Sequence, residues 1–252
     1  MIASLPMYDR AETADILDTL WAETRARLPK GAPDHLTRDG DLWGQWTHPD
    51  LILSQTCGYP YRTSLIGKVQ LIAAPDNQLP DCPPGHYNSV FVVRDDESRR
   101  DLTAFANAPF AYSEALSQSG WAAPQNHAAG LGFTFANTIP TGAHVNSTRA
   151  VAEGRADIAC IDALSWQLIL RHDPHAAALR EIGRTIPTPS LPFITGRGQY
   201  ASAIAAALGA AIAALPPTAR DAIGLHGLVQ IADADYLAVA NPAPPQSVPS
   251  RA

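Results

Sequence analysis

The sequence predicts an α/β protein with mostly parallel sheets, and three observations support this prediction. Short apolar runs of strand length alternate with longer segments whose apolar residues recur at helical spacing. The alternation is regular after Asp101, where residues 110–112, 117–129 and 158–161 are predicted in turn as strand, helix and strand. Hydrophobic residues form 46% of the 252 residues and charged residues 17%, which is enough apolar material for a buried core. Strands that alternate with helices in this way usually pair in parallel.

The N-terminal half begins with a predicted strand and helix. Residues 1–7 form an apolar run of strand length. Asp9 and Glu12 have the spacing of a capping box, so we expect a helix from about Arg10. A helical turn is expected over residues 41–46, and the short apolar runs flanked by turn residues predict strands over residues 51–53, 69–73 and 89–93.

In the C-terminal half, the sequence pattern predicts further strands and helices, followed by a tail. A strand is expected over residues 133–135, and helices are expected over residues 144–153, 163–170 and 199–215. Residues 185–194 contain three prolines and lead back toward the first half of the fold. The Pro- and Ser-rich segment from Asn241 has no core positions, and we expect it to be loose.

Composition argues against several classes of protein. The formal net charge is −6 and no dense Lys/Arg stripe occurs, so nucleic acid is not an expected partner. No apolar run reaches the ~18 residues that a membrane span needs. Three scattered cysteines are too few for a disulfide framework. The first residues lack the basic segment of a secretory signal, so the chain as written is expected in the cytoplasm; a trimmed form of a periplasmic protein is the alternative.

The segment Ser117-Gln118-Ser119-Gly120 is the most informative for chemistry, because it lies where a strand ends and a helix begins. Backbone N–H groups are free at such a junction, and the helix dipole adds partial positive charge. Ser117 and Ser119 can donate further hydrogen bonds, and Gly120 permits close approach of an oxyanion. The alternative interpretation is an ordinary N-cap by Ser117.

Ser-x-Ser-Gly followed by Trp121 and Pro124 resembles the phosphate-contacting motif of the phosphate- and phosphonate-binding proteins of ABC importers, which are periplasmic binding proteins of the second structural type. Residues 51–61 are similar to the strand and Gly-Pro-x-x-Tyr-like turn of that family. Gly142-Ala143-His144 resembles its Gly-Ser-His, and residues 154–162 its Gly-x-x-Asp-Ile-Ala-x-x-Asp strand. The resemblance covers roughly residues 1–240, and Gln118 replaces the usual middle Thr.

The resemblance implies two α/β lobes joined by two crossing strands, with the ligand in the cleft and the lobes closing on it. Lobe one would be residues 1–90 plus 187–252, and lobe two residues 91–186. It further implies a monomeric solute-binding protein that captures a small oxyanion such as phosphate, a phosphonate or a phosphoester. The expected partner is an ABC-transporter permease, and no cofactor, metal or catalytic residue is expected.

Other candidate ligand residues lie at matching places, and each has a structural alternative. Tyr8 follows the first strand, where parallel sheets place ligand loops. Asp162 and His144 begin helices, and by resemblance both would face the cleft; an N-cap and a surface histidine are the alternatives. Trp121 is either a wall of the cleft or a core residue. The loop after the strand at residues 51–53 adds Ser54, Gln55, Thr56 and Tyr59.

Two further functions remain open at this stage. One is a cytoplasmic enzyme on the same fold, as in menaquinone- or thiamine-precursor synthesis, although no acid–base pair or cysteine-rich motif is present. The other is a ligand-sensing module that acts through a partner protein. Cys57 has no His or Asp beside it to form a nucleophilic pair. His172-Asp173-Pro174-His175 is interpreted as a solvated helix end and not as a metal site.

Overall fold

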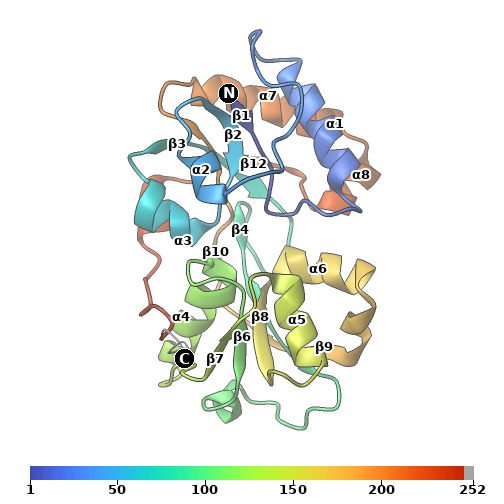
Figure 1. The fold of residues 1–252 in the computed structure, drawn as a ribbon, viewed down its shortest axis with the longest axis vertical. Helices are drawn as coiled ribbons and strands as arrows, with labels where there is room; N and C mark the ends of the chain where they lie inside the picture. Colours follow the sequence, from blue (N-terminus) through green and yellow to red (C-terminus); the bar gives the residue numbers. More distant parts are fainter. Residues whose placement is uncertain (247–252) are drawn as a thin grey trace. The chain divides into compact units, whose positions relative to one another are not determined.

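The computed structural model describes residues 1–246 and divides them into two compact units (Figure 1). Unit 1 consists of Met1–Tyr87 and Thr188–Val239. Unit 2 consists of Asn88–Pro187 together with the chain from Ala240 to the last described residue, Gln246. The chain therefore passes from one unit to the other three times.

The third passage corrects the predicted extent of lobe one, which included the whole C-terminal segment. Residues 240–246 belong to unit 2, where two side chains hold their backbone. The indole Nε1 of Trp121 donates to the Ala243 carbonyl at 3.0 Å, and the amide of Asn126 donates to the Ala240 carbonyl at 2.9 Å. Ala240 and Ala243 thus have specific partners, and Ala243 lies in the segment from Asn241 that was predicted to be loose. Residues 247–252 of that segment lie outside the described residues.

Unit 1 contains a five-stranded sheet with the order β1-β2-β11-β3-β12. The strands β1 and β2 are parallel, whereas β11 is antiparallel to both β2 and β3, and β12 is antiparallel to β3. The bounds are β1 Ile2–Ala3, β2 Leu51–Gln55, β3 Val69–Asp76, β11 Phe193–Gly196 and β12 Gly227–Val229. A separate antiparallel ribbon pairs β4 (His86–Tyr87) with β10 (Thr188–Pro189).

Helices cover both faces of this sheet (Figure 1). One core lies under α1 and α7 and includes Trp21, Leu53 and Leu208. The other core joins Trp46 of α2, Tyr61 of η1 and Tyr236 of α9. The bounds are α1 Ala14–Arg25, α2 Leu42–Trp46, α3 Gly58–Pro60, η1 Tyr61–Leu65, α7 Ala201–Ala214, α8 Pro217–Ile223 and α9 Asp233–Leu237.

Unit 2 contains a second five-stranded sheet with the order β7-β6-β8-β5-β9. The strand β6 is parallel to β7 and β8, whereas β5 is antiparallel to β8 and β9. The strands are β5 Ser89–Arg94, β6 Phe110–Tyr112, β7 Thr138–Pro140, β8 Ile158–Asp162 and β9 Leu179–Arg184. The helices are η2 Leu102–Phe105, η3 Gln118–Ala122, α4 Ala123–Gly130, α5 His144–Ala152, α6 Ala163–His172 and η4 Pro174–Ala178.

The α/β class is confirmed, but the sheets are mixed and not mostly parallel. The strands β5 and β11 cause the difference, because each lies inside its sheet and runs against its neighbours. Parallel neighbours need a long crossover, usually through a helix. Here β5 follows β4 directly and β11 follows β10 with no helix between them, so neither strand is placed by such a crossover.

The helix expected from about Arg10 begins four residues later, at Ala14. The predicted capping residues are used elsewhere, since Asp9 pairs with Arg38 at 2.7 Å and Glu12 pairs with Arg10 at 3.2 Å. The hydroxyl of Thr13 accepts from the Arg10 N–H and donates to the Tyr8 carbonyl, which forms a turn before the helix. The capping pattern therefore marked the turn and not the first helical residue.

The strand expected over residues 133–135 does not form; the strand is β7, Thr138–Pro140. The Gln125 side chain explains the difference. Its amide donates to the Phe135 carbonyl at 2.9 Å and accepts from the Phe135 N–H at 3.1 Å, as a neighbouring strand would. Phe135 is buried and stacks on Phe110 with ring centroids 4.3 Å apart. The apolar residues thus serve the core without entering the sheet.

Among residues 1–246, no single helix has both the length and the hydropathy that a membrane crossing requires; only α7 and α8 taken together reach them, across a bend of 115°.

Candidate functional site

Three predicted ligand segments of unit 2 lie at one edge of its sheet. The parallel strands β6, β7 and β8 all end there, because parallel strands share the edge that holds their carboxyl ends. Ser117 follows β6, His144 follows β7, and Asp162 is the last residue of β8. The sequence-based grouping of these three segments agrees with the register of the sheet.

The turn that starts at Ser117 is a π-helix, η3, which continues into α4. The hydroxyl of Ser117 caps it by accepting from the Gly120 N–H at 2.9 Å. The Ser117 carbonyl accepts from both Trp121 and Ala122, which widens the turn. Single π-turns inside helices are frequent at functional sites. The N-cap predicted for Ser117 is therefore present, in a turn of unusual width.

Ser119 and His144 meet across this edge. The Ser119 hydroxyl lies 2.8 Å from Nε2 of His144, and the Ser117 hydroxyl lies 3.5 Å from that of Ser119. The other ring nitrogen, Nδ1 of His144, is buried and has no hydrogen-bond partner among the described residues. Burial lowers the pKa of His144 to about 4, so the imidazole is neutral near pH 7. In either tautomer one ring nitrogen is left to be satisfied from outside the described protein.

Gly120 has a different role from the one expected. A Cβ atom built on Gly120 would lie 2.4 Å from the hydroxyl of Ser113 and 3.2 Å from its backbone nitrogen. The space beside its Cα is therefore filled by Ser113, at the end of β6, and is not open to an oxyanion. Glycine is required here so that η3 can approach the strand.

The remaining predicted residues of unit 2 are buried. Asp162 caps α6 by accepting from the Ser165 N–H at 2.7 Å, which is the structural alternative considered for it. Trp121 packs on Tyr112 with ring centroids 5.0 Å apart, and its indole nitrogen is occupied by Ala243. Gln118 is buried as well. The printed contacts give Asp162 and Trp121 a structural role whether or not they also touch a ligand.

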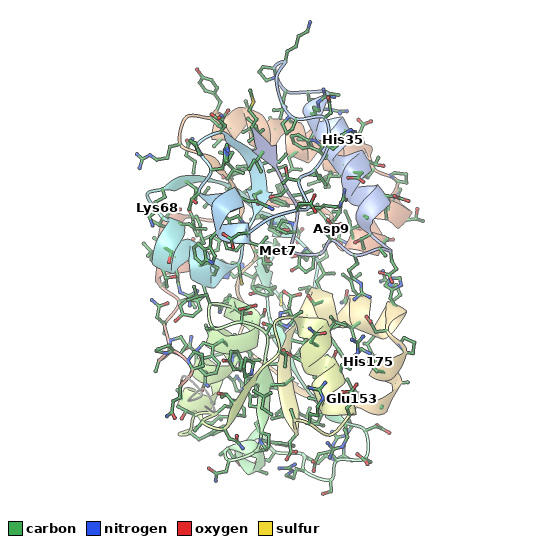
Figure 2. The ribbon with its side chains drawn as sticks, viewed as in Figure 1. Met7, Asp9, His35, Lys68, Glu153 and His175 are labelled. Carbon is green, nitrogen blue, oxygen red and sulfur yellow. The ribbon has the colours of Figure 1, made fainter. Side chains whose placement is uncertain are left out.

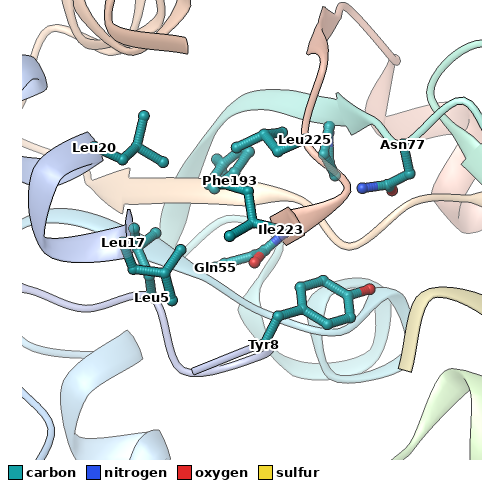
Figure 3. Close-up of a pocket in the computed structure, with 10 residues that line it drawn as sticks. Leu5, Tyr8, Leu17, Leu20, Gln55, Asn77, Phe193, Ile223 and Leu225 are labelled. Carbon is teal, nitrogen blue, oxygen red and sulfur yellow. The ribbon is translucent and has the colours of Figure 1, made fainter. Parts of the chain in front are cut away.

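In unit 1 the strands β1, β2 and β3 point the same way, because β11 is antiparallel to both β2 and β3. Their carboxyl ends border a pocket of about 20 Å³ (Figure 3). Its polar groups are those of Tyr8, in the segment after β1, of Gln55, the last residue of β2, and of Asn77, the residue after β3. Tyr8 and Gln55 were predicted from the sequence, whereas Asn77 was missed.

The other predicted residues of unit 1 differ in their surroundings. The Ser54 hydroxyl is buried and bonds to that of Ser4 at 2.8 Å, so it holds β1 to β2. Thr56 is fully buried, and its hydroxyl has no hydrogen-bond partner among the described residues. Tyr59 is buried under Arg62, whose guanidinium carbon lies 4.6 Å from the Tyr59 ring centroid.

Arg62 is a buried cation in η1 that sequence reasoning missed. Burial lowers its pKa, while Cys57, Tyr87 and Tyr59 act in the opposite direction. Contact with an aromatic face stabilises such a cation when water is excluded. One signal could have identified it, because Arg62 is the single charged residue between positions 51 and 67.

The histidines and cysteines that the sequence analysis did not assign to a metal or catalytic site are accounted for as follows. His175 (Figure 2) lies 2.9 Å from the Thr148 hydroxyl through its Nε2 atom, so it links η4 to α5. Within residues 1–246, no group of three His, Cys, Asp or Glu side chains is placed to hold a metal ion. The three cysteines are free thiols.

A family model described as "ABC transporter, phosphonate, periplasmic substrate-binding protein" matches residues 56–236. This match covers more than half of the chain and includes every predicted ligand residue except Tyr8, Ser54 and Gln55. No curated protein matches the chain.

Several solved structures share the fold. PhnD1 from Prochlorococcus marinus in complex with methylphosphonate is 16% identical, with a TM-score of 0.69 over 93% of this chain and 94% of that one. A binding component of a phosphonate ABC transporter, PA3383 from Pseudomonas aeruginosa, is 15% identical, with a TM-score of 0.67 over 94% and 82%. XAC2383 from Xanthomonas citri, bound to chloride, is 15% identical, with a TM-score of 0.65 over 93% of each chain. These neighbours confirm the two-lobe fold that the resemblance implied.

Proposed function

Because the chain belongs to the phosphonate-binding family of ABC-transporter periplasmic substrate-binding proteins, we propose that the hydroxyl and imidazole groups of Ser117, Ser119 and His144 bind the oxyanion of its ligand. The family is a substrate-binding component of a transporter and not an enzyme, which argues against the alternative of an enzyme on the same fold. The structural neighbour PhnD1 holds methylphosphonate, which supports a phosphonate or phosphate as the ligand class here.

The observation that carries this proposal is the contact between Ser119 and His144 at the end of the parallel strands. If Nδ1 of His144 carries the proton, Nε2 accepts from Ser119 and the buried Nδ1–H can donate to an anion. If Nε2 carries the proton, it donates to Ser119, whose own hydrogen is then free to donate. Either arrangement supplies a donor in a site with little water, where hydrogen bonds to a charged oxygen are strong.

Replacing Ser119 with alanine tests the proposal. A hydrogen bond to a charged group contributes about 1.5–3 kcal/mol, so Ser119→Ala should weaken binding of methylphosphonate and of inorganic phosphate by roughly tenfold or more in titration calorimetry. Ser165→Ala is the matched control. It removes the same hydroxyl near the same sheet edge, but its backbone N–H, not its side chain, bonds to Asp162. Equal affinity of Ser119→Ala and the unmodified protein would contradict the assignment.

The transporter partner follows from the family, since the described function of its members is to serve an ABC transporter. We further propose that the chain acts as a monomer that delivers its ligand to a permease. We propose the periplasm as its location, since delivery to the permease of an importer takes place there. Subcellular fractionation distinguishes this location from the cytoplasmic alternative.

A further inference from the structure

A C-terminal strap, residues 240–246, lies on unit 2 beside η3 and α4 (Figure 1). It is held through its backbone, because the Ala243 carbonyl accepts from the indole Nε1 of Trp121 at 3.0 Å and the Ala240 carbonyl accepts from the Asn126 amide at 2.9 Å. The two donors lie 122 and 114 residues earlier in the chain. The proposed function gives this contact no role, although Trp121 follows closely after Ser119 in the sequence.

The composition of the strap favours docking on an aromatic side chain. It contains Pro242, Pro244 and Pro245. Proline fixes φ and keeps the residue before it extended, so such a segment loses little conformational entropy when it docks. Extended proline-rich segments are commonly bound by aromatic surfaces. The buried Trp121 therefore has a preformed partner in the strap.

Trp121 is part of the same wide turn as Ser119. The Ser117 carbonyl accepts from the Trp121 N–H at 3.1 Å and from the Ala122 N–H at 3.0 Å, so the backbone of Trp121 helps to close η3. A π-turn of this kind is rare, and the more usual α-helical turn would place the residues after Ser117 differently. The width of the turn is therefore coupled to the position in which the Trp121 side chain is held.

The Trp121 ring also packs against the strand that supports the segment before His144. It contacts Tyr112 at the end of β6, with ring centroids 5.0 Å apart. The Tyr112 carbonyl accepts from the N–H of Thr141 at 2.9 Å and from the hydroxyl of Thr141 at 2.9 Å. The chain then continues from Thr141 into the helix that His144 begins. Both partners of the contact between Ser119 and His144 are thus supported at the end of β6, next to Trp121.

We infer that the strap positions Ser119 for ligand binding by fixing the indole of Trp121 through the Ala243 carbonyl. The inference rests on the proposed function, because it concerns how the hydroxyl proposed to bind the oxyanion is held. A buried indole N–H that loses its acceptor must find another partner, which favours a different position of the ring. The turn that carries Ser119 then relaxes, and the contact between Ser119 and His144 changes. The strap and the Trp121 indole are positioning elements, which act on the ligand through Ser119.

Trp121→Phe in the full-length chain tests the inference, because phenylalanine keeps a ring on Tyr112 but lacks the indole donor. Titration calorimetry should show binding of methylphosphonate weakened by about three- to tenfold, the range that a neutral hydrogen bond contributes. Trp166→Phe is the matched control and should leave the affinity unchanged. Trp166 is a buried residue of α6 in the same unit, and its indole is not the donor to Ala243.

A chain that ends after Val239 removes the strap without changing any residue of the proposed site. It should lose affinity by a similar factor, whereas a chain that ends after Gln246 should bind as the full-length chain does. In the chain that ends after Val239, Trp121→Phe should have little further effect, because both changes remove the same interaction. Additive losses would mean that Trp121 and the strap act independently, and would overturn the inference.

The signal of the His144 ring in proton NMR, identified by its absence in His144→Gln, separates positioning from a general loss of stability. It should shift in Trp121→Phe and in the chain that ends after Val239, and stay unchanged in Trp166→Phe. Denaturant unfolding first shows that each variant is folded under the conditions used. If the shortened chain does not fold, Trp121→Phe still provides the test. An unchanged His144 signal in every folded variant that lacks the Trp121–Ala243 bond would refute the inference.

The outcomes separate this inference from the proposed function. If the unmodified protein binds neither methylphosphonate nor phosphate, the proposed function fails, and the His144 signal alone decides whether the strap positions Ser119. If Ser119→Ala weakens binding but neither Trp121→Phe nor the chain that ends after Val239 does, only the inference about the strap fails. A loss of affinity that is already complete in the chain that ends after Gln246 would refute the assignment to the Ala243 carbonyl.

Discussion

The two units place different side chains at the corresponding edge of their sheets, where the carboxyl ends of their like-directed strands meet. Each brings together the carboxyl ends of three strands that point the same way, yet unit 2 places hydroxyl and imidazole groups there, whereas unit 1 places an apolar pocket with amides and, nearby in sequence, the buried Arg62. Unit 2 also closes a helix tightly against a strand through Gly120. In each unit the strand ends bring these side chains together, and the residues that follow the strands decide which chemical groups are presented there.

The largest effect is expected from a substitution in unit 2 that disrupts the close approach of η3 to β6. In Gly120→Ala the new Cβ would meet the Ser113 hydroxyl at 2.4 Å, and overpacking of this kind costs about 1–3 kcal/mol. We expect a loss near the upper end of that range, measured by denaturant unfolding, together with weaker binding of methylphosphonate. Gly130→Ala is the control, because within residues 1–246 no atom outside its chain neighbours and its own helix backbone lies within 4 Å of the added Cβ. If both variants were equally stable, the close approach of η3 to β6 would not be needed.

The stability of unit 2 should depend on pH through His144, which distinguishes its strand ends from those of unit 1. The pKa of His144 is about 4 in the folded protein and 6.5 as a free group, so the unfolded chain binds more protons between these values. The free energy of unfolding should therefore fall as the pH is lowered from 6.5 to 4. A shift of that size corresponds to roughly 3.4 kcal/mol, and we expect less because the residue as a whole keeps partial exposure.

Denaturant unfolding at several pH values measures this dependence, with His144→Gln as the comparison. The substituted protein should have a flatter stability profile between pH 6.5 and 4, since the glutamine amide does not titrate there. An unchanged profile would mean that another group is responsible for the loss.

The smallest expected effect concerns the two buried threonines of unit 1. The Thr56 hydroxyl has no partner among the described residues, whereas that of Thr195 donates to the Leu51 carbonyl at 3.1 Å. Thr56→Val should therefore be neutral or slightly stabilising, and Thr195→Val should cost about 1 kcal/mol. Paired thermal melts measure both variants. A clear destabilisation by Thr56→Val would show that its hydroxyl has a partner, such as a bound water.

Local signals in the sequence predicted the helix caps at the strand ends of unit 2 well. Ser117 and Asp162 cap the helices that follow them, because an N-cap depends only on residues three positions away. The contact between Ser119 and His144 could be placed only through the resemblance to a family, since 25 residues separate them.

Long-range contacts explain what was missed. Asn77 is fixed by Gly224, 147 residues away, so nothing near it in the sequence indicates a pocket. The expected strand over residues 133–135 has the right apolar residues, but its backbone partner is the Gln125 side chain and not another strand. The predicted parallel sheets were wrong in part for a similar reason, because β5 and β11 follow the passages between units without an intervening helix.

The hydrogen bond from Trp121 to Ala243 has a consequence for how this protein can be exchanged or recombined. Unit 2 looks like a continuous insertion of residues 88–187, which a single gene segment could carry into a relative. It is not, because the acceptors for Trp121 and Asn126 come from beyond Val239. A chimera that takes only the insertion would leave the indole and the amide facing a foreign C-terminus. Exchange of this unit between relatives therefore requires two separate gene segments, residues 88–187 and the chain from Ala240, to move together, which ties the C-terminal segment to the middle of the chain.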